Sequence, residues 1–201
     1  MTKTKKKRGF IPFFILLIVL AALFAGVCLL WHQSHQTLYE ARYPLDYEDY
    51  VIKYAKLYDV PPEMVYAIIK TESNFDPEAT SHRDAYGLMQ ITKETFWWAQ
   101  AKMGIEEDID FYDPETNIRY GTYIYSLFYQ EFGNERTALA AYNAGRGNVN
   151  NWLADPAYSA DGVEIDVIPY EETRNYVDKV LASKQAYAKL YGERFAGKIS
   201  S

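Results

Sequence analysis

The sequence is short of the residues that build metal centres and disulfide bonds. Its 201 residues include one cysteine, Cys28, and three histidines, His32, His35 and His82. A single cysteine excludes an intrachain disulfide bond, and it also excludes a zinc site made of several cysteine and histidine ligands. We therefore expect no metal and no cofactor. Any chemistry should depend on carboxylates, amides and hydroxyls.

Acidic residues are missing from the start of the chain, where basic residues are concentrated. No acid precedes Glu40, whereas five of the first eight residues are Lys or Arg. The 22 residues from Phe10 to Trp31 carry no charge, which is enough for an apolar helix to span a bilayer core of about 30 Å. The basic flank predicts a cytoplasmic N-terminus and an outer location for everything after Trp31. We expect a single-pass protein of the cell membrane.

Two kinds of processing are alternatives to an uncleaved anchor. A cleaved signal peptide has an apolar region of about 7–15 residues and a small-residue cleavage site, but this run is longer and no such site stands near its end. Lipid attachment at Cys28 fits poorly because the bulky Val27 precedes it. We predict a cytoplasmic tail over 1–9, an anchor over 10–31 and a polar linker over 32–45.

Positive charge is scarce in the part of the chain that follows the apolar run. That part holds 16 of the 21 Lys and Arg residues and all 27 acidic residues, which gives it a net charge of −11. Such a domain is not held to nucleic acid by net charge, so we expect no nucleic-acid partner. Its ligand should be bound by shape and hydrogen bonds.

Strand patterns and internal repeats are absent too, whereas helical periodicity is frequent. We predict a compact, mainly α domain over 46–191, followed by a tail over 192–201. The expected helices cover 47–58, a segment from Pro61 onward, 92–102, 113–132, 137–142 and 171–191. The one β-like stretch is 88–91. Gly104, Gly133 and Gly192 are expected to end helices, and Gly145 and Gly147 to adopt turns with positive φ.

The predicted helix after Pro61 has an apolar face that ends in a carboxylate. Glu72 follows Ile68 by four residues and Ile69 by three, so the three side chains share one face. A carboxyl at the edge of an apolar stripe is desolvated, which raises its pKa toward neutrality. A general acid that works near pH 7 needs such a pKa. The alternative is a glutamate that reaches solvent at a helix end.

Several blocks of sequence occur in an order that is typical of one enzyme family. The blocks are ESNFDPEATSHRDAYGLMQI over 72–91, ALAAYNAG over 138–145 and IPYEETRNYV over 168–177, with DPETNIRYG over 113–121 between them. Together they resemble the lytic transglycosylases of the soluble-transglycosylase type, in the goose-lysozyme-like superfamily. The resemblance covers about 46–191 and implies a lysozyme-like helical domain. Two positions depart from the family pattern: Asp84-Ala85 replaces Gly-Ala, and Lys93 replaces a proline.

The resemblance also implies roles for individual residues. Glu72 would be the catalytic acid and base. We assign six residues to the substrate-binding site on this resemblance: Ser73, Ser81, Gln90, Tyr142, Asn143 and Tyr176. Ser81 would lie near the N-acetyl group of the reacting sugar, Tyr142 would lie close to Glu72, and Tyr176 would face the active centre. The alternative role for Ser73 is to cap the helix end or to fix Glu72, and the alternative for Tyr142 and Tyr176 is a place in the core.

The implied reaction cleaves the β-1,4 bond between N-acetylmuramic acid and N-acetylglucosamine in peptidoglycan. A lytic transglycosylase can work with one carboxylate, because a hydroxyl of the same sugar replaces water as the nucleophile and leaves a 1,6-anhydro end. Ordinary glycosidases use two carboxylates. A muramidase that uses water is therefore an alternative, with Asp76 or Asp84 as the second carboxylate. A non-catalytic wall-binding domain is another.

Overall fold

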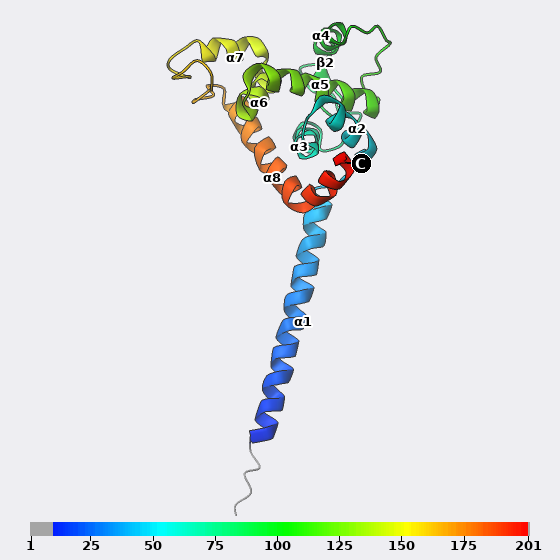
Figure 1. The fold of residues 1–201 in the computed structure, drawn as a ribbon, viewed down its shortest axis with the longest axis vertical. Coiled ribbons are helices and arrows are strands. Elements are labelled where there is room, and N and C mark those ends of the chain that lie inside the picture. The colour runs from blue at the N-terminus through cyan, green and yellow to red at the C-terminus, as the bar shows by residue number, and fades with distance from the viewer. Residues whose placement is uncertain (1–9, 201) are drawn as a thin grey trace, which may run out of the picture. The chain divides into compact units, whose positions relative to one another are not determined.

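The chain forms two compact units. The computed structural model describes residues 10–200, without the side chains of 10–14 and 32–36. The units divide between Pro44 and Leu45. Unit 1 contains helix α1 (Phe10–Arg42), and unit 2 contains all the other elements (Figure 1). The basic tail expected over 1–9 lies outside the described residues.

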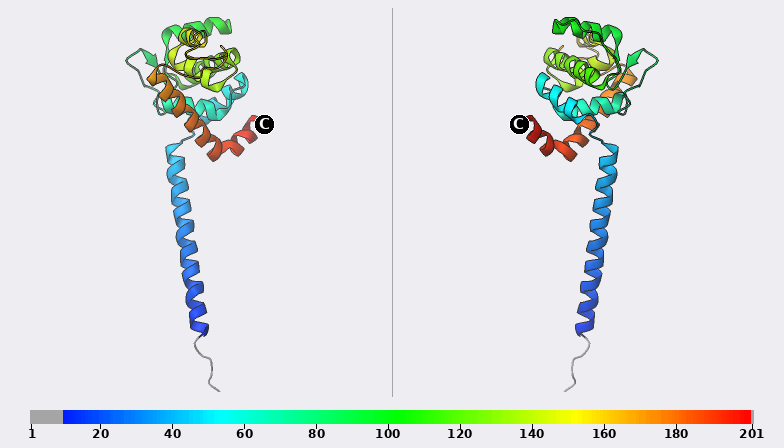
Figure 2. Two further views of the ribbon diagram at one scale, coloured as in Figure 1. Left: turned by 90° about the vertical axis from the view of Figure 1, so that its left-hand side faces the viewer. Right: turned by 90° about the vertical axis from the view of Figure 1, so that its right-hand side faces the viewer.

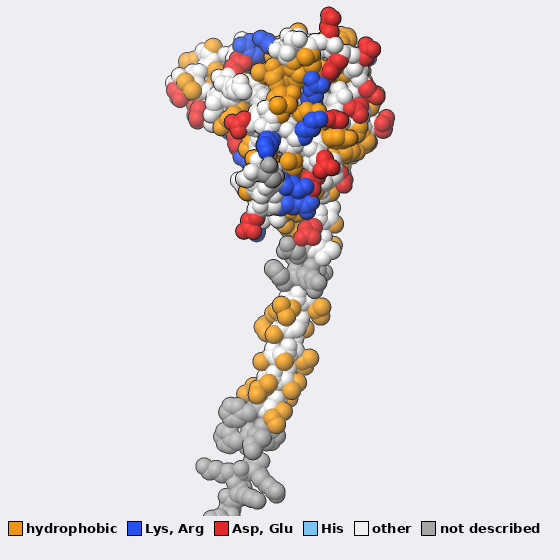
Figure 3. All heavy atoms as spheres, turned by 45° about the vertical axis from the view of Figure 1, so that its right-hand side comes forward, with side chains coloured by type: hydrophobic (Ala, Val, Ile, Leu, Met, Phe, Trp, Pro, Cys, Tyr) orange, Lys and Arg blue, Asp and Glu red, His pale blue; other side chains and the backbone are white. Residues whose placement is uncertain are grey.

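Helix α1 is longer than the predicted anchor. It continues through Arg42, so the polar segment that we expected to be a linker is mostly helical. The reason is local, since no glycine or proline interrupts the segment before Pro44. The described apolar side chains over 15–31 are almost all exposed, and those on the visible face are seen in Figure 3. Among the residues whose side chains are described, no helix has an apolar stretch long enough to cross a membrane.

Unit 2 is mainly α-helical, as predicted. Its helices are α2 (Glu48–Tyr58), α3 (Pro62–Glu72), α4 (Lys93–Met103), α5 (Pro114–Phe132), α6 (Glu135–Ala144), α7 (Arg146–Leu153) and α8 (Glu171–Ser200). Side-chain caps explain where three of these helices begin, because Thr92, Asp113 and Asn134 each accept a hydrogen bond from the backbone three residues later. Many acidic side chains lie on the face seen in Figure 3, in keeping with the net negative charge.

Helix α3 forms the centre of the core. All six residues over 64–69 are completely buried, so the helix is enclosed on every side rather than on one face. Its most extensive packing is against α8, which runs from the α6 and α7 side of the unit to the α2 and α3 side (Figures 1 and 2). The ring of Tyr66 in α3 stacks on Tyr187 and Phe195 of α8, at centroid distances of 5.1 and 5.6 Å. These contacts fix the helix that carries Glu72.

A two-stranded hairpin follows α3, and its position corrects the predicted strand. Strand β1 (Ala85–Tyr86) pairs antiparallel with β2 (Ile91–Thr92), with Ala85 opposite Thr92 and Tyr86 opposite Ile91. The segment 87–90, most of the stretch expected to be β, is instead the connecting turn. Gly87 and Gln90 both have positive φ, of 72° and 49°, which a strand does not allow.

The C-terminal segment and α7 differ from the prediction. Helix α8 does not end at Gly192 but continues to Ser200, because Phe195 is buried and Arg194 forms two hydrogen bonds, of 2.8 and 2.6 Å, with Glu48. The segment that we expected to be a tail is therefore part of unit 2. Gly147 lies inside α7 rather than in a turn, whereas Gly145 has the expected positive φ of 87°.

Candidate active site

Glu72 is the last residue of α3, at the point where the buried helix meets a cavity. The chain turns sharply after it, since Asn74 and Phe75 both have positive φ, of 50° and 69°. The Glu72 side chain is half-buried and lines a cavity of about 440 Å³. We call this cavity the groove. The fully buried residues of α3 and the sharp turn together place one carboxyl at its wall.

Burial raises the pKa of Glu72 to about 7. The Tyr176 hydroxyl acts in the opposite direction and lowers this pKa, whereas the negative charge of Glu172 raises it. Near pH 7 the carboxyl therefore populates both its acid and its carboxylate form. A single group in this state can donate a proton in one step and accept one in the next.

Two tyrosines lie beside Glu72, Tyr142 half-buried and Tyr176 buried. Tyr142 of α6 lines the groove and donates a hydrogen bond of 2.9 Å to the Met89 carbonyl. Tyr176 of α8 is 7% exposed, and its hydroxyl has no partner of ordinary hydrogen-bond geometry among the described residues, although it is near enough to affect Glu72. Burial raises the pKa of both phenols well above the usual value, and the Glu72 charge adds to this. Both remain neutral hydroxyls.

Ser81 and Gln90 come from the loop and turn around the hairpin. The Ser81 hydroxyl oxygen accepts hydrogen bonds of 3.2 Å from the backbone amides of Arg83 and Ala85, so its own proton is free to point into the groove. The Gln90 amide nitrogen donates to the carbonyls of Ala79 and Gly87, at 3.1 and 2.9 Å. Both residues line the groove, as does Asn143.

Ser73 is not among the residues that line the groove. Its hydroxyl lies 2.9 Å from the Leu88 carbonyl and 3.2 Å from the Ile69 carbonyl. It therefore ties the end of α3 to the hairpin turn. This position favours the helix-end role over substrate contact.

A buried amide behind the turn holds the hairpin in place. Asn117 of α5 accepts a hydrogen bond from the Met89 amide (2.7 Å) and donates to the carbonyls of Tyr86 and Phe111, both at 2.9 Å. A Cβ on Gly87 would lie 2.3 Å from the Asn117 amide nitrogen. Glycine is required there both for positive φ and for this close approach.

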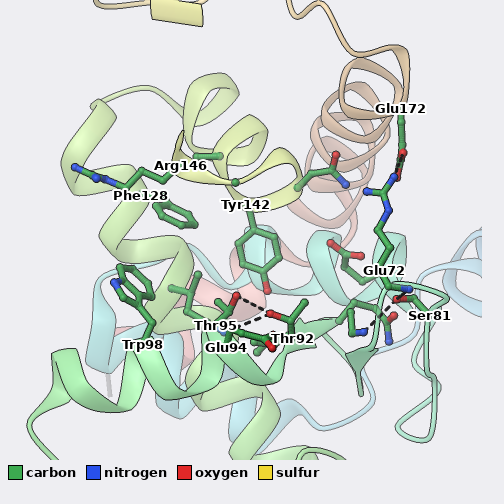
Figure 4. Close-up of a pocket in the computed structure, with 18 of the residues that line it drawn as sticks. Glu72, Ser81, Thr92, Glu94, Thr95, Trp98, Phe128, Tyr142, Arg146 and Glu172 are labelled. Atoms are coloured by element: carbon green, nitrogen blue, oxygen red, sulfur yellow. Dashed lines mark hydrogen bonds and ion pairs between the residues drawn. The ribbon is translucent and has the colours of Figure 1, made fainter. Parts of the chain in front are cut away.

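Two pairs of groove residues were not identified from the sequence. At one end, Arg83 forms an ion pair of 2.7 Å with Glu172. At the other end, the ring of Trp98 stacks on Phe128 with centroids 5.9 Å apart. In Figure 4, Glu172 and Glu72 lie on the opposite side of Tyr142 from Trp98 and Phe128. Arg83 and Glu172 belong to the 72–91 and 168–177 blocks, whereas Trp98 and Phe128 lie outside every block.

The carboxylates proposed for a water-using reaction are not placed as expected. Neither Asp76 nor Asp84 lines the groove, and Asp76 instead accepts a hydrogen bond of 3.0 Å from the Glu78 amide in a turn. Glu94 and Glu172 do line it. Among the described residues, no group of three or more His, Cys, Asp and Glu side chains is arranged to hold a metal ion.

Comparison with known proteins identifies relatives of unit 2. Residues 49–162 match the transglycosylase SLT domain. The soluble lytic murein transglycosylase of Escherichia coli K12 is 39% identical over 161 residues, which cover 77% of this chain and 25% of that protein. The membrane-bound lytic murein transglycosylase C of Salmonella arizonae is 28% identical over 159 residues, covering 67% of this chain and 44% of that protein. The chain thus spans about a quarter of the length of the soluble relatives.

Solved structures show the same fold. The 70 kDa soluble lytic transglycosylase of Escherichia coli superposes with a TM-score of 0.68 and 35% identity, covering 77% of this chain and 26% of that one. An inactive mutant of the lytic transglycosylase Slt from Pseudomonas aeruginosa gives a TM-score of 0.67 and 34% identity, covering 75% and 25%. A lysozyme-like helical domain was the fold that the sequence blocks implied.

Proposed function

Because the chain belongs to the transglycosylase SLT domain family, we propose that it is a lytic transglycosylase of bacterial peptidoglycan. The bond cleaved is the β-1,4 bond between N-acetylmuramic acid and N-acetylglucosamine. The observation that carries the proposal is the half-buried Glu72 carboxyl in the groove wall, whose pKa is raised to about 7. A neutral carboxyl at that position is the acid that glycosidic oxygen requires.

The mechanism uses Glu72 twice. The neutral acid protonates the glycosidic oxygen, the C1–O bond breaks, and N-acetylglucosamine leaves with its hydroxyl. The resulting carboxylate then takes the proton of the C6 hydroxyl while that oxygen bonds to C1 of the muramic acid. The product has a 1,6-anhydro end, Glu72 is again protonated, and no water is consumed. The attacking hydroxyl belongs to the same sugar, so its effective concentration is high.

The other groove residues support binding and orientation. Ser81 donates its free proton to the N-acetyl carbonyl of the sugar whose C1 reacts, and Gln90 and Asn143 form polar contacts with the strand. Tyr142 holds the hairpin turn against Glu72 through the Met89 carbonyl. Tyr176 gives the Glu72 carboxylate a hydroxyl neighbour after the first proton transfer. Ser73 positions the end of α3 rather than touching the sugar.

The products distinguish this reaction from hydrolysis. Glu172 lines the groove and is the described carboxylate whose charge affects Glu72, so it is the residue that would serve a water-using muramidase. Mass spectrometry of digested peptidoglycan is the test. We expect muropeptides that are lighter by one water than hydrolysis products. Reducing-end muramic acid as the main product would contradict the proposal.

A charge-removing substitution tests the assignment of Glu72. Glu72→Gln keeps the shape of the side chain but cannot cycle between acid and base, so lytic activity should fall by at least about a hundredfold. Glu63→Gln is the matched control, because it makes the same change at the other end of α3 and lies outside the groove. Retention of full activity in Glu72→Gln would show that another group performs the proton transfers.

We also propose that α1 anchors unit 2 to the outer face of the cell membrane, with residues 1–9 in the cytoplasm. The support is the uncharged run from Phe10 to Trp31, its basic flank, and the helical conformation of the whole run. Carbonate washing of membranes is the test. The full chain should stay in the pellet, and a variant with Leu17, Leu20 and Leu23 changed to Asp should be released. Release of the unaltered chain would overturn the anchor.

A further inference from the structure

A second cavity adjoins the groove at Trp98 and Arg146. It has a volume of about 250 Å³ and is lined by those two residues together with Lys102, Leu127 and Glu131. Because Trp98 and Arg146 line both cavities, the two cavities meet at these side chains. We call the second cavity the outer hollow. It extends the groove at the end away from Glu172.

The indole ring of Trp98 presents a flat surface where the two cavities meet, and packing against Phe128 fixes its orientation. Its ring lies nearly parallel to that of Phe128, at an interplanar angle of 18°, and Phe128 is itself only 7% exposed. The contact fixes Trp98 from one side, while the indole stays partly accessible. An aromatic ring with an apolar face and a polar N–H edge suits the face of a pyranose ring, which also combines C–H groups with polar edges.

The neighbouring tryptophan has none of these features. Trp97 is 54% exposed, lines neither cavity and points to a different side of α4. If this part of α4 only required an aromatic residue, Trp97 and Trp98 would not be expected to differ in their contacts with the cavities. The chain therefore contains a matched pair of adjacent tryptophans, of which only one faces the groove.

Polar groups that suit a sugar surround the platform. Arg146 donates through Nε to both carboxylate oxygens of Glu131, at 2.7 Å each, which fixes the orientation of its guanidinium group. Its terminal amino groups keep donors for a ligand. Lys102, one turn after Trp98 on the same helix, adds a third polar side chain to the hollow. Hydroxyl and N-acetyl groups of a sugar need such donors and acceptors.

We propose that Trp98 is the stacking platform of a further subsite, which binds one more sugar ring of the glycan strand beyond those held at Glu72. The proposal rests on the glycan substrate of the proposed function, but not on cleavage. A ring at Trp98 is remote from the reacting bond. It therefore contributes binding energy for long strands, which can be measured without turnover at Glu72.

Binding to oligosaccharides of two lengths tests the subsite without turnover. The full chain is prepared in detergent micelles as Glu72→Gln, and its affinity for chitobiose and chitohexaose is measured by calorimetry. Both probes carry the same β-1,4-linked N-acetylglucosamine backbone. Trp98→Ala should weaken chitohexaose binding at least about fivefold, the scale of a buried aromatic contact, and change chitobiose binding by less than about twofold. Trp97→Ala should change neither.

The outcomes separate the subsite from a structural role and from the proposed reaction. Trp98→Phe retains a flat ring and should recover most of the affinity for chitohexaose. Three results would each overturn the subsite. Trp98→Ala and Trp97→Ala could bind chitohexaose equally well, Trp98→Ala could lose the same affinity for both sugars, or the unaltered site could bind chitohexaose no better than chitobiose. Cleavage by the unaltered chain together with any of these results would leave the proposed function intact. Length-dependent binding that needs Trp98, without any anhydro product, would support the subsite and contradict the proposed reaction.

One other occupant of the hollow has a distinct signature. The acidic stem peptide of peptidoglycan could pair with Lys102. In that case Lys102→Gln would weaken binding of peptide-bearing glycan strands, and Trp98→Ala would have no effect on peptide-free chitohexaose. This pattern would overturn the sugar platform.

Discussion

Ionising Glu72 in the folded chain costs free energy, because its carboxyl lies among protein atoms rather than in water. In the unfolded chain the pKa is near 4.5, whereas in the folded chain burial raises it to about 7. Below pH 4.5 both states hold the proton and there is no penalty. Between pH 4.5 and 7 the unfolded chain releases this proton while the folded chain retains it, so stability is lost progressively over that range and the loss is complete above about pH 7.

The substitution that should abolish activity should therefore stabilise the fold at high pH. The two pKa values differ by an amount that converts to roughly 3 kcal/mol, and partial solvent access lowers our expectation to about 2 kcal/mol. In urea denaturation at pH 8.5, the free energy of unfolding of Glu72→Gln should exceed that of the unaltered chain by this amount. At pH 4.5 the difference should nearly vanish. A stability difference that does not change with pH would show that Glu72 is not desolvated as described.

Tyr176 should control the pH range in which Glu72 works. Its hydroxyl lowers the Glu72 pKa, so Tyr176→Phe should raise that pKa and move the fall in kcat on the alkaline side to higher pH. The direction follows because the acid form of Glu72 is needed in the first step. Tyr142→Phe is the comparison, since it removes a hydrogen bond to the Met89 carbonyl and should cost about 1 kcal/mol of stability. A pH profile of kcat that is unchanged in Tyr176→Phe would exclude the contact.

The part of the site that depends on a single side chain at a recognisable sequence position was predictable. Glu72 followed from the apolar face of its helix and from the sequence blocks, and Ser81, Gln90, Tyr142 and Asn143 line the same cavity. The functional role of each remains a prediction. Trp98 could not be found, because a partly exposed tryptophan on a helix has the same local pattern whether or not a cavity adjoins it. Only packing against Phe128, 30 residues later in the chain, distinguishes it.

At the scale of elements, the hairpin turn depends on a close approach between the Gly87 backbone and the side-chain amide of Asn117. Gly87→Ala would place a Cβ 2.3 Å from the Asn117 amide nitrogen, at a φ of 72°. Gly104→Ala meets a similar φ of 67° but has no neighbouring atom within 4 Å. Gly104→Ala is the control, and it should lower the free energy of unfolding by about 1 kcal/mol because of the left-handed conformation alone. Gly87→Ala should cost about 2 kcal/mol more, because the Asn117 hydrogen bonds must shift. Equal losses in thermal unfolding would show that the turn can relax around the added methyl group.

Helices were easier to predict than the hairpin for a physical reason. The starts of α4 and α5 are determined by neighbours three residues apart, through the capping side chains of Thr92 and Asp113. The hairpin has two residues in each strand, too few for an alternating pattern. Its register depends on Asn117, about 30 residues away, which no local pattern indicates. The end of α8 was missed similarly, because the ring of Tyr66 lies far from Phe195 in sequence.

At the scale of the whole molecule, the negative charge of unit 2 and the nature of its groove are consistent with each other. A domain with a net charge of −11 gains nothing from long-range attraction to an acidic wall polymer. The groove combines aromatic rings with amides and hydroxyls, which bind an uncharged sugar backbone by contact. Specific binding should therefore change little between low and physiological salt, in contrast to the steep loss expected of a polycation.

The boundaries of the folded unit give the last prediction. Residues 46–191 were expected to form the whole domain, yet α8 continues to Ser200 and contributes Phe195 to the core, at 2% exposure. A fragment ending at residue 191 loses the Phe195 ring from the face of Tyr66 and the paired hydrogen bonds between Arg194 and Glu48. Loss of a buried phenylalanine alone costs about 3–5 kcal/mol. That is a large part of the total of about 5–15 kcal/mol available to a domain.

Three chains should separate that contribution from the rest of the segment. A fragment of residues 45–201 should unfold cooperatively, and Phe195→Ala within it should lose about 3–4 kcal/mol in urea denaturation. The fragment 45–191 should lose more and bind a dye specific for exposed apolar surface. Leu57→Ala is the control, because Leu57 is 62% exposed and its loss should change stability by less than about 0.5 kcal/mol. If 45–191 were as stable as 45–201, the end of α8 would be dispensable and the domain would end where the sequence alone placed it.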